Sequence, residues 1–266
     1  MHAPRLFSTG LEQKLCVNGR RLEAREDDLE PWLEGRSVAL LVAALHDPAA
    51  ELLMPLCAAF HARGVRPVVL GLDPFPFEPA PAGERAAEAA ASCLTQADAV
   101  LLLSSEAICE PAGARNLEAV WESGAQALLG GSQALLGALS GGRLAAPEAW
   151  AELRAALAGQ GAVYAALGVG RGPDAAARAL ADAMHLRWKR HLSTGRAAPR
   201  AALLAAGREV TLPEARALHA GLGELGAPPP VLIAGDDSSL DDEARCLVLA
   251  RAALSPNVIP LAGART

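Results

Sequence analysis

The chain has 266 residues, of which 52% are hydrophobic and only 3% aromatic, and it carries a formal net charge of −6 at pH 7. This length allows one large core or two modest ones, and the hydrophobic content excludes a disordered chain. The acidic balance gives no general attraction to nucleic acid or to an anionic membrane, so we expect neither as a partner.

Near the start of the chain, short apolar stretches flank a turn. Leu15–Val17 and Arg21–Leu22 lie on either side of Asn18-Gly19, a two-residue turn signal that predicts a hairpin. The N-terminal residues lack the apolar core of a signal peptide, and no apolar run approaches the roughly 20 residues needed to span a bilayer. The scattered cysteines are typical of small buried residues in a reduced protein. We therefore expect a soluble, cytoplasmic protein without membrane insertion.

The first half of the chain predicts three buried strands separated by helices. The strands are the apolar runs Val38–Leu45, Pro67–Leu72 and Ala99–Leu103, and the helices cover Ala50–Arg63 and Glu84–Leu94. This alternation predicts a parallel sheet with right-handed crossovers. The proline-rich stretch 73–83 is expected to be a loop, with at least one of Phe75 and Phe77 buried.

A long helical pattern follows from Asn116 to about Leu139. It contains four glycines, each of which costs about 1 kcal/mol against alanine in an exposed helix. Glycine is tolerable where a helix packs closely on its neighbours, so we expect a central, closely packed helix. Trp121 in this helix and Trp32 upstream are expected to pack in the core.

The second half predicts further helices and strands separated by glycine- and proline-containing loops. The helices are Pro147–Leu157, Asp174–Arg190 and Leu212–Leu225, and the strands are Ala162–Leu167, Ala201–Ala206, Val231–Ala234 and Cys246–Ala252.

Three stretches of this sequence together resemble FtsZ, the bacterial tubulin homologue. The first, residues 68–106, matches the family's strand, PFxFEG-like turn, helix and strand at Pro74, Phe75, Phe77, Glu78, Arg85, Leu94 and Asp98. The second, residues 167–183 (LGVGRGPDAAARALADA), is similar to the strand-to-helix turn GIGxAxGxxRAxxAAxxA. The third, residues 203–225, resembles the segment GGxDLTLxEVxxAxxxI, with Val210, Thr211, Leu212 and Glu214 in place.

The resemblance implies an α/β fold in three parts. We expect a reduced tubulin/FtsZ-like parallel-sheet subdomain over residues 1–115, a long central helix over 116–140, and an α+β C-terminal subdomain over 141–266. The alternative is a small doubly wound domain in the first half, in which the FxF residues beside prolines serve ordinary loop packing.

The GTP-binding loops of the family are not matched. Such loops need glycines, because backbone N–H groups must come close to the phosphates. At one of these places the strand Val38–Leu45 is followed by His46-Asp47-Pro48-Ala49-Ala50-Glu51, which has no glycine and two carboxylates. The stretch before Val38 is too short for the first glycine-rich loop, so the first strand–helix units are expected to be deleted or shrunken. We expect no cofactor, no metal and no catalytic residue, and a pseudo-GTPase instead of an enzyme.

In the family, a loop after the central helix supplies acidic residues that activate water in the next subunit of a filament. The resemblance places this loop at 147–153, where Ala149 stands at the first acidic position and Glu152 at the second. The expected partner interface comprises Pro147, Glu148, Trp150 and Glu152. The alternative is that Glu152 is an ordinary exposed helix residue.

A local basic cluster stands out in this acidic chain. Its candidate patch residues are Arg187, Lys189, Arg190 and Arg196. One interpretation is a surface for an acidic partner, and the other is a helix C-terminus, where cations interact favourably with the helix dipole.

The sequence therefore predicts a non-catalytic FtsZ-like protein that binds or regulates a tubulin-like filament in cell division or a related cytoskeletal process. The expected partner is FtsZ or another tubulin-like filament protein, with self-association as a further expectation. The alternatives are a small-ligand-binding protein or enzyme that reuses the α/β cleft, and a scaffold that self-assembles without nucleotide.

Overall fold

The computed structural model describes residues 7–8, 15–17, 20–22, 38–105, 108, 116–140, 147–158, 163–184, 197–225 and 229–252. It is an α/β structure that divides into two compact units. The first unit is Met1–Val100 with Asn257–Thr266, and the second is Leu101–Pro256. None of the described helices combines the length and the hydropathy that a membrane span requires. Trp32 lies outside the described residues.

The first unit begins with a small antiparallel sheet. Its strands are β1 (Phe7–Ser8), β2 (Leu15–Val17) and β3 (Arg20–Leu22). Leu15 pairs with Leu22 and Val17 with Arg20, so only two residues connect β2 to β3. The hairpin predicted around Asn18-Gly19 is therefore confirmed.

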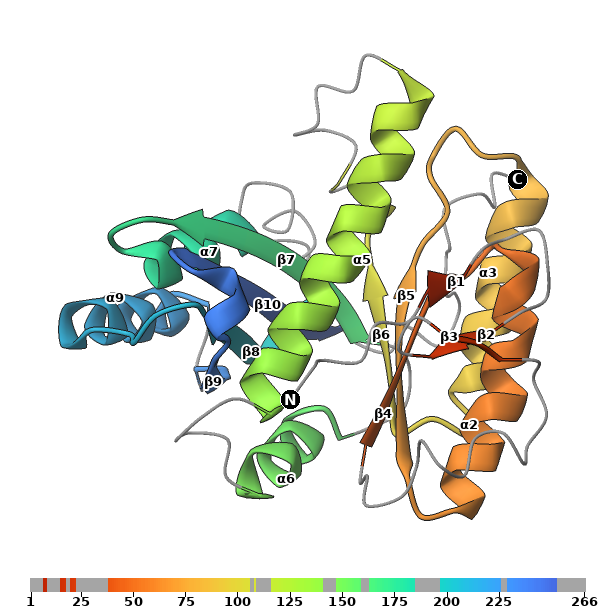
Figure 1. Cartoon of the computed structure of the whole chain (residues 1–266), viewed down its shortest axis with the longest axis horizontal. Helices are drawn as coiled ribbons and strands as arrows, with labels where there is room; N and C mark the ends of the chain where they lie inside the picture. The colour runs from red at the N-terminus through yellow and green to blue at the C-terminus, as the bar shows by residue number, and fades with distance from the viewer. Residues whose placement is uncertain are drawn as a thin grey trace. The chain divides into compact units, whose positions relative to one another are not determined.

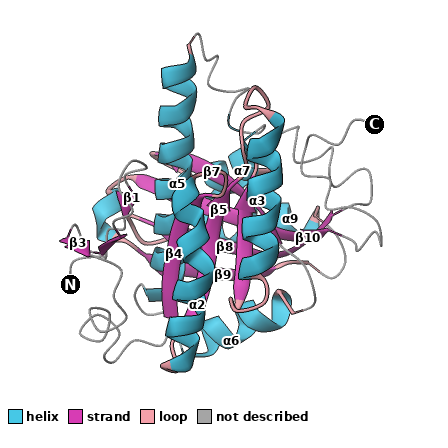
Figure 2. Cartoon of the chain, turned by 90° about the vertical axis from the view of Figure 1, so that its right-hand side faces the viewer, coloured by secondary structure: helices cyan, strands magenta, loops and turns pink. Residues whose placement is uncertain are grey.

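Two parallel strands and two helices form the larger part of the first unit. They are β4 (Val38–Ala44), β5 (Arg66–Leu72), α2 (Leu53–Ala62) and α3 (Ala80–Cys93), with the short 3₁₀ helix η2 (Pro48–Leu52) leading into α2. β4 and β5 pair from Val38–Arg66 to Ala44–Leu72. Figure 2 shows α2 and α3 side by side over this pair. Cys57 of α2 and Cys93 of α3 are both fully buried, which agrees with small apolar roles for these thiols.

The ends of these two helices follow local chemistry. Gly64 ends α2 with a φ of 73°, and the N–H of Val65 returns to the carbonyl of Phe60, as expected for a glycine after a helix. α3 begins at Ala80, earlier than the predicted Glu84. Pro81 stands in its first turn, where a missing N–H costs nothing. The prediction of loop as far as residue 83 was therefore wrong at its end.

The second unit contains a five-strand arrangement in the order β6-β7-β10-β8-β9. The strands are β6 (Ala99–Leu103), whose first two residues fall in the first unit, β7 (Val163–Arg171), β8 (Ala197–Ala206), β9 (Val231–Asp236) and β10 (Glu243–Ala252). β6 with β7 and β8 with β9 are parallel, whereas β10 runs antiparallel to both β7 and β8. The helices are α5 (Leu117–Ser140), α6 (Pro147–Ala156), α7 (Ala175–Ala183), α9 (Leu212–Gly223) and the 3₁₀ helix η4 (Ser238–Leu240).

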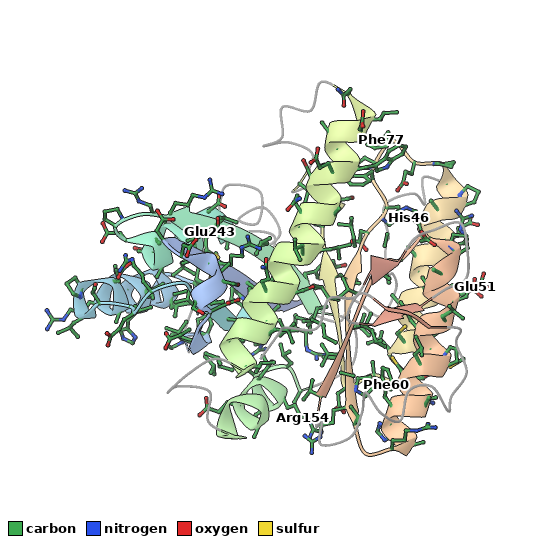
Figure 3. The ribbon with its side chains drawn as sticks, in the orientation of Figure 1. His46, Glu51, Phe60, Phe77, Arg154 and Glu243 are labelled. Atoms are coloured by element: carbon green, nitrogen blue, oxygen red, sulfur yellow. The ribbon has the colours of Figure 1, made fainter. Side chains whose placement is uncertain are left out.

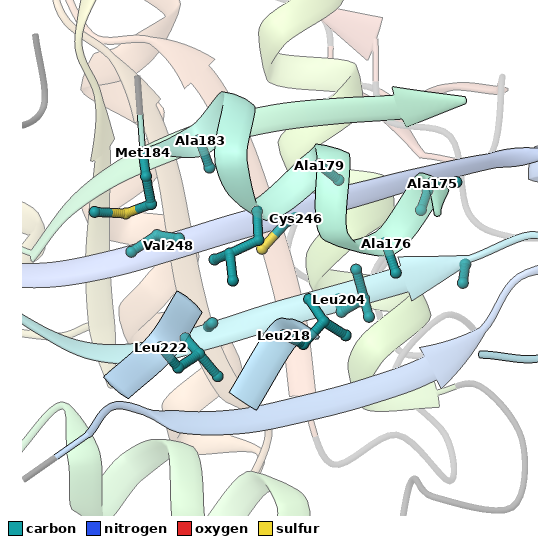
Figure 4. Packing of buried hydrophobic residues seen from close by; sticks show 14 of the residues in the cluster. Ala175, Ala176, Ala179, Ala183, Met184, Leu204, Leu218, Leu222, Cys246 and Val248 are labelled. Carbon is teal, nitrogen blue, oxygen red and sulfur yellow. The ribbon is translucent and has the colours of Figure 1, made fainter. Parts of the chain in front are cut away.

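Helices cover both faces of this sheet (Figure 1). Successive residues of a strand point to opposite faces. Leu167 of β7 meets α5, whereas the next residue, Gly168, meets α7, so the two helices lie on opposite faces. On the face of α7 and α9, alanines and leucines form a core with Cys246 and Val248 of β10 (Figure 4). Small side chains thus fill this core, as the low aromatic content indicates.

The glycines of α5 and of the facing strands allow close contact. A Cβ at Gly137 would lie 2.6 Å from the Cβ of Ala205, and one at Gly235 of β9 would overlap the carbonyl oxygen of Gly137. The prediction of a closely packed helix is confirmed. Trp121 on the same helix is 53% exposed, however, so its predicted place in the core was wrong.

Candidate functional site

The loop after β4 takes the place where the resemblance expects a phosphate-binding loop. The carboxylate Oδ1 of Asp47 accepts a hydrogen bond from the N–H of Ala49 at 2.8 Å, and the backbone carbonyl of Asp47 accepts one from Ala50 at 2.8 Å. Pro48 between them has no N–H to offer. The backbone N–H groups at the start of η2 are thus either bonded within the loop or, at Pro48, absent. The carboxylate of Asp47 occupies the position that a bound anion would take.

A second set of contacts joins this loop to the turn after β5. His46 Nε2 lies 3.1 Å from Glu78 Oε1, and Arg85 Nε donates to the carbonyl of His46 at 3.2 Å. Glu78 Oε2 accepts from the N–H of Phe75 at 2.7 Å. His46 and Phe77 are labelled in Figure 3. Glu78 and Arg85, two residues of the FtsZ-like stretch, therefore hold two loops together at one edge of the β4–β5 pair.

Asp73 adds a carboxyl group at the same strand edge. It follows β5 directly, and its Oδ1 is buried without a hydrogen-bond partner among the described residues. Burial raises the pKa of Asp73 to about 7 because low polarity disfavours the charged form. At pH 7 Asp73 is therefore about half neutral. The negative charge at this edge comes from Asp47 and Glu51, and it is the opposite of what a triphosphate needs.

The two phenylalanines of the turn differ in burial. Their rings stack with centroids 5.4 Å apart. Phe75 is buried at 3% exposure, whereas Phe77 is 46% exposed. The expectation that at least one of them is buried is confirmed by Phe75.

α6 carries the expected partner interface. Leu153 and Leu157 on or just after this helix are buried, and Arg251 of β10 donates a hydrogen bond to the carbonyl of Leu157. Glu152 and Arg154, on either side of Leu153, are exposed (Arg154 in Figure 3). Pro147, Glu148 and Trp150 belong to the helix, but their side chains lie outside the described residues. Glu152 therefore stands on an anchored helix, facing solvent.

A partly buried ion pair fixes the start of α9. Glu214 is 3% exposed and accepts hydrogen bonds from both terminal nitrogens of Arg208, at 2.8 and 3.1 Å. Glu214 also accepts from the N–H and the hydroxyl of Thr211, in a capping box. Arg208 donates further to the carbonyl of Gly172. The spacing Thr-x-x-Glu signals the capping box in the sequence, whereas nothing there signals Arg208 as the partner.

The second unit has a shallow hollow beside this ion pair. Its volume is about 160 Å³, part of which is open solvent, and it is lined by Ala175, Ala176, Ala206, Arg208, Glu209, Val210, Glu214, Glu243 and Ala244. Ligand pockets usually measure about 300–1,000 Å³, so this hollow gives no support to the ligand-binding alternative. Across the described residues, no three His, Cys, Asp or Glu side chains are grouped to hold a metal ion. The basic patch residues Arg187, Lys189, Arg190 and Arg196 lie outside the described residues.

Comparison with known proteins identifies the fold. No family model and no curated protein matches the sequence. An FtsZ dimer from M. jannaschii is 15% identical with a TM-score of 0.68, over 86% of this chain and 67% of that one. A CetZ from Methanosaeta thermophila is 14% identical with a TM-score of 0.61, over 88% and 68%. CetZ2 from Haloferax volcanii, in a GTPγS-bound protofilament, is 18% identical with a TM-score of 0.56, over 89% and 73%.

These likenesses confirm the predicted fold. The chain has an FtsZ/tubulin-like α/β fold, and the three sequence stretches that resembled FtsZ pointed to it correctly.

Proposed function

We propose that this FtsZ-like chain is a cytoplasmic, non-catalytic protein that binds or regulates a tubulin-like filament, in cell division or a related process. The observation that carries the proposal is the cap on the loop after β4, where Asp47 takes the N–H of Ala49 and Pro48 offers none. A loop closed by its own carboxylate does not cradle phosphates. The carboxylates of Asp47 and Glu51 in this loop support the same conclusion.

Purified protein should therefore carry no guanine nucleotide and hydrolyse none. Calorimetric titration with GTP and magnesium should show no binding in the micromolar range, with the host's own FtsZ as the positive control. Nucleotide released by denaturing the purified protein should also be undetectable by chromatography. A bound GTP or GDP in either experiment would contradict the proposal.

The surface of α6 is the proposed contact with the filament. Two of the similar structures are assemblies, an FtsZ dimer and a CetZ2 protofilament. A head-to-tail contact propagates only when both faces of a subunit work. This chain keeps a helix at the place of the catalytic loop, but its nucleotide face is altered. We infer that it joins one end of a filament and stops further addition, with Trp150 as an apolar anchor and Glu152 as a charge contact.

This capping should appear in sedimentation of the host's FtsZ with GTP. At about one-tenth of the FtsZ concentration, the protein should lower the polymer mass and shorten the filaments, because one capped end stops many additions. Trp150→Ala and Glu152→Arg should remove the effect, since an interface of standard size depends on a few central residues.

Glu88→Arg is the matched control for the charge reversal, because Glu88 is exposed on α3 in the other unit. It should cap as the unmodified protein does. Unchanged polymer mass, filament length and co-sedimentation with the unmodified protein would rule out capping, even if the nucleotide experiment succeeds.

A further inference from the structure

The central helix α5 has two chemically different faces. One face packs on the sheet: Val120, Ala127 and Ala134 are buried, and a Cβ at Gly130 would lie 2.7 Å from Leu167 of β7. The contact with the strands is therefore complete without the opposite face. The core of the second unit gives no role to the opposite face of α5.

The opposite face carries a row of exposed apolar residues. Leu117 and Trp121 are each 53% exposed, Leu129 is 47% exposed, and Ala125 between them is also exposed. These four residues are spaced four apart, so they form one ridge along the helix. Single exposed apolar residues are ordinary, but a contiguous row with a tryptophan is typical of an interaction surface. We name these four residues the α5 ridge.

The charges beside the α5 ridge have one sign. Glu118 and Glu122 are exposed and are the charged residues of this helix, which contains no Lys, Arg or His. The hydroxyl of Ser123 donates to the carbonyl of Ala119, so it is directed at its own helix. The ridge therefore presents apolar side chains bordered by negative charge. Its complement is a segment that combines apolar residues with positive charge.

The chain itself contains such a segment between α7 and β8. Residues 185–196 read HLRWKRHLSTGR, with Arg187, Lys189, Arg190 and Arg196 but no acidic residue, and with Leu186 and Trp188 as apolar members. We propose that the α5 ridge of one copy binds segment 185–196 of a second copy. This contact goes beyond the proposed filament function, which uses α6.

The contact is heterologous, because the ridge and the segment are different surfaces. A bound pair still offers one free ridge, on one copy, and one free segment, on the other, so association continues beyond a dimer without nucleotide. The ridge is small: a tryptophan contributes only about 150–250 Å², and a stable interface buries about 1,200–2,000 Å² in total. We therefore expect weak association, with a dissociation constant on the order of 100 µM at low salt. Exposed charge pairs are screened, so association should weaken several-fold at high salt.

Sedimentation velocity over a concentration series of the full chain tests the proposal. At about 50 mM salt the unmodified protein should form species beyond the dimer, and at about 500 mM salt these should largely dissociate. Glu118→Lys with Glu122→Lys should abolish association, and so should Arg187→Glu with Lys189→Glu. Glu84→Lys with Glu88→Lys on α3 is the control, and this variant should associate as the unmodified protein does.

Mixing the variants gives the sharper result. Each variant keeps one intact surface. In a mixture of the Glu118→Lys/Glu122→Lys and Arg187→Glu/Lys189→Glu proteins, the two intact surfaces should pair and the two reversed surfaces should pair, so the variants should associate alternately beyond a dimer. A chain that carries all four substitutions should associate again. If either variant fails to fold, Trp121→Ala and competition by a synthetic 185–196 peptide replace it, and both should block association.

Three results would overturn the proposal. One is a monomeric unmodified protein at about 200 µM in low salt. Another is a ridge variant that associates as tightly as the unmodified protein. The third is salt-dependent compaction that does not depend on protein concentration, which would place the segment on the ridge of its own chain.

Discussion

Replacing Gly168 by alanine should destabilise the protein by about 3 kcal/mol or more, the upper range for overpacking a core. A Cβ at this position would overlap the carbonyl oxygen of Ala179 and the amide nitrogen of Ala183, both backbone atoms of α7. Backbone atoms in a helix have no alternative rotamer, so α7 must move away from β7 as a whole. Urea unfolding, monitored by circular dichroism, measures the decrease in the free energy of unfolding.

Gly223→Ala is the matched control. Gly223 ends α9, and nothing lies within 4 Å of a Cβ built there. The substitution should be neutral or stabilise by up to about 1 kcal/mol, because alanine has the higher helix propensity. If Gly168→Ala unfolds at the same urea concentration as the unmodified protein, α7 does not lie directly on β7.

This expectation explains the glycine motif of residues 168–170. In many folds, G-x-G before a helix binds phosphate. Here a Cβ at Gly170 would likewise overlap the carbonyl oxygen of Ala175. The two glycines let the alanine-rich helix α7 lie directly on the strand, where it contributes Ala175, Ala179 and Ala183 to the core. Their role is packing.

Removing the carboxylate of Glu214 should cost about 1–3 kcal/mol, the usual effect of losing charge-assisted hydrogen bonds together with a helix N-terminal cap. The cost stays in this range because the Arg208 side chain is 35% exposed and water can solvate it. Glu214→Ala removes the carboxylate that accepts two hydrogen bonds from Arg208, and it also removes the capping box that Glu214 forms with Thr211. Unfolding in urea at pH 7 measures the loss. Glu209→Ala is the control: Glu209 is exposed on the same connection, and its loss should change the stability by less than about 0.5 kcal/mol.

The effect of Glu214 should also depend on pH. Burial alone would raise the pKa of Glu214, but the hydrogen bonds from Thr211 and Arg208 outweigh burial and lower the pKa below its ordinary value. A group with a lowered pKa in the folded state stabilises the fold above its unfolded pKa and loses that contribution as the pH falls. The stability difference between the unmodified protein and Glu214→Gln should therefore shrink between pH 7 and pH 3. A constant difference would show that the charge of Glu214 does not stabilise the fold.

The sequence by itself determined the features that depend on neighbours along the chain. Continuous apolar runs located β4, β5 and β6 to within a residue or two. β5 and β6 are buried at nearly every position, as a strand covered on both faces requires, whereas β4, at the end of the strand order, is mostly half-buried. Asn18-Gly19 located the β2–β3 hairpin, and Thr211 with Glu214 marked the capped start of α9. Three motifs in the right order pointed to the FtsZ/tubulin-like fold.

Only the tertiary structure decided the features that depend on which elements meet. The insertion of β10 between β7 and β8 brings the last strand between two earlier ones, and no local pattern encodes such an order. Arg208, six residues before Glu214 on the connection between β8 and α9, became its partner because this connection folds back over the start of α9. Trp121 looked like a core residue by its helical spacing, yet the strands cover the other face of α5. Periodicity tells which residues share a face, whereas the packing of distant segments decides which face is buried.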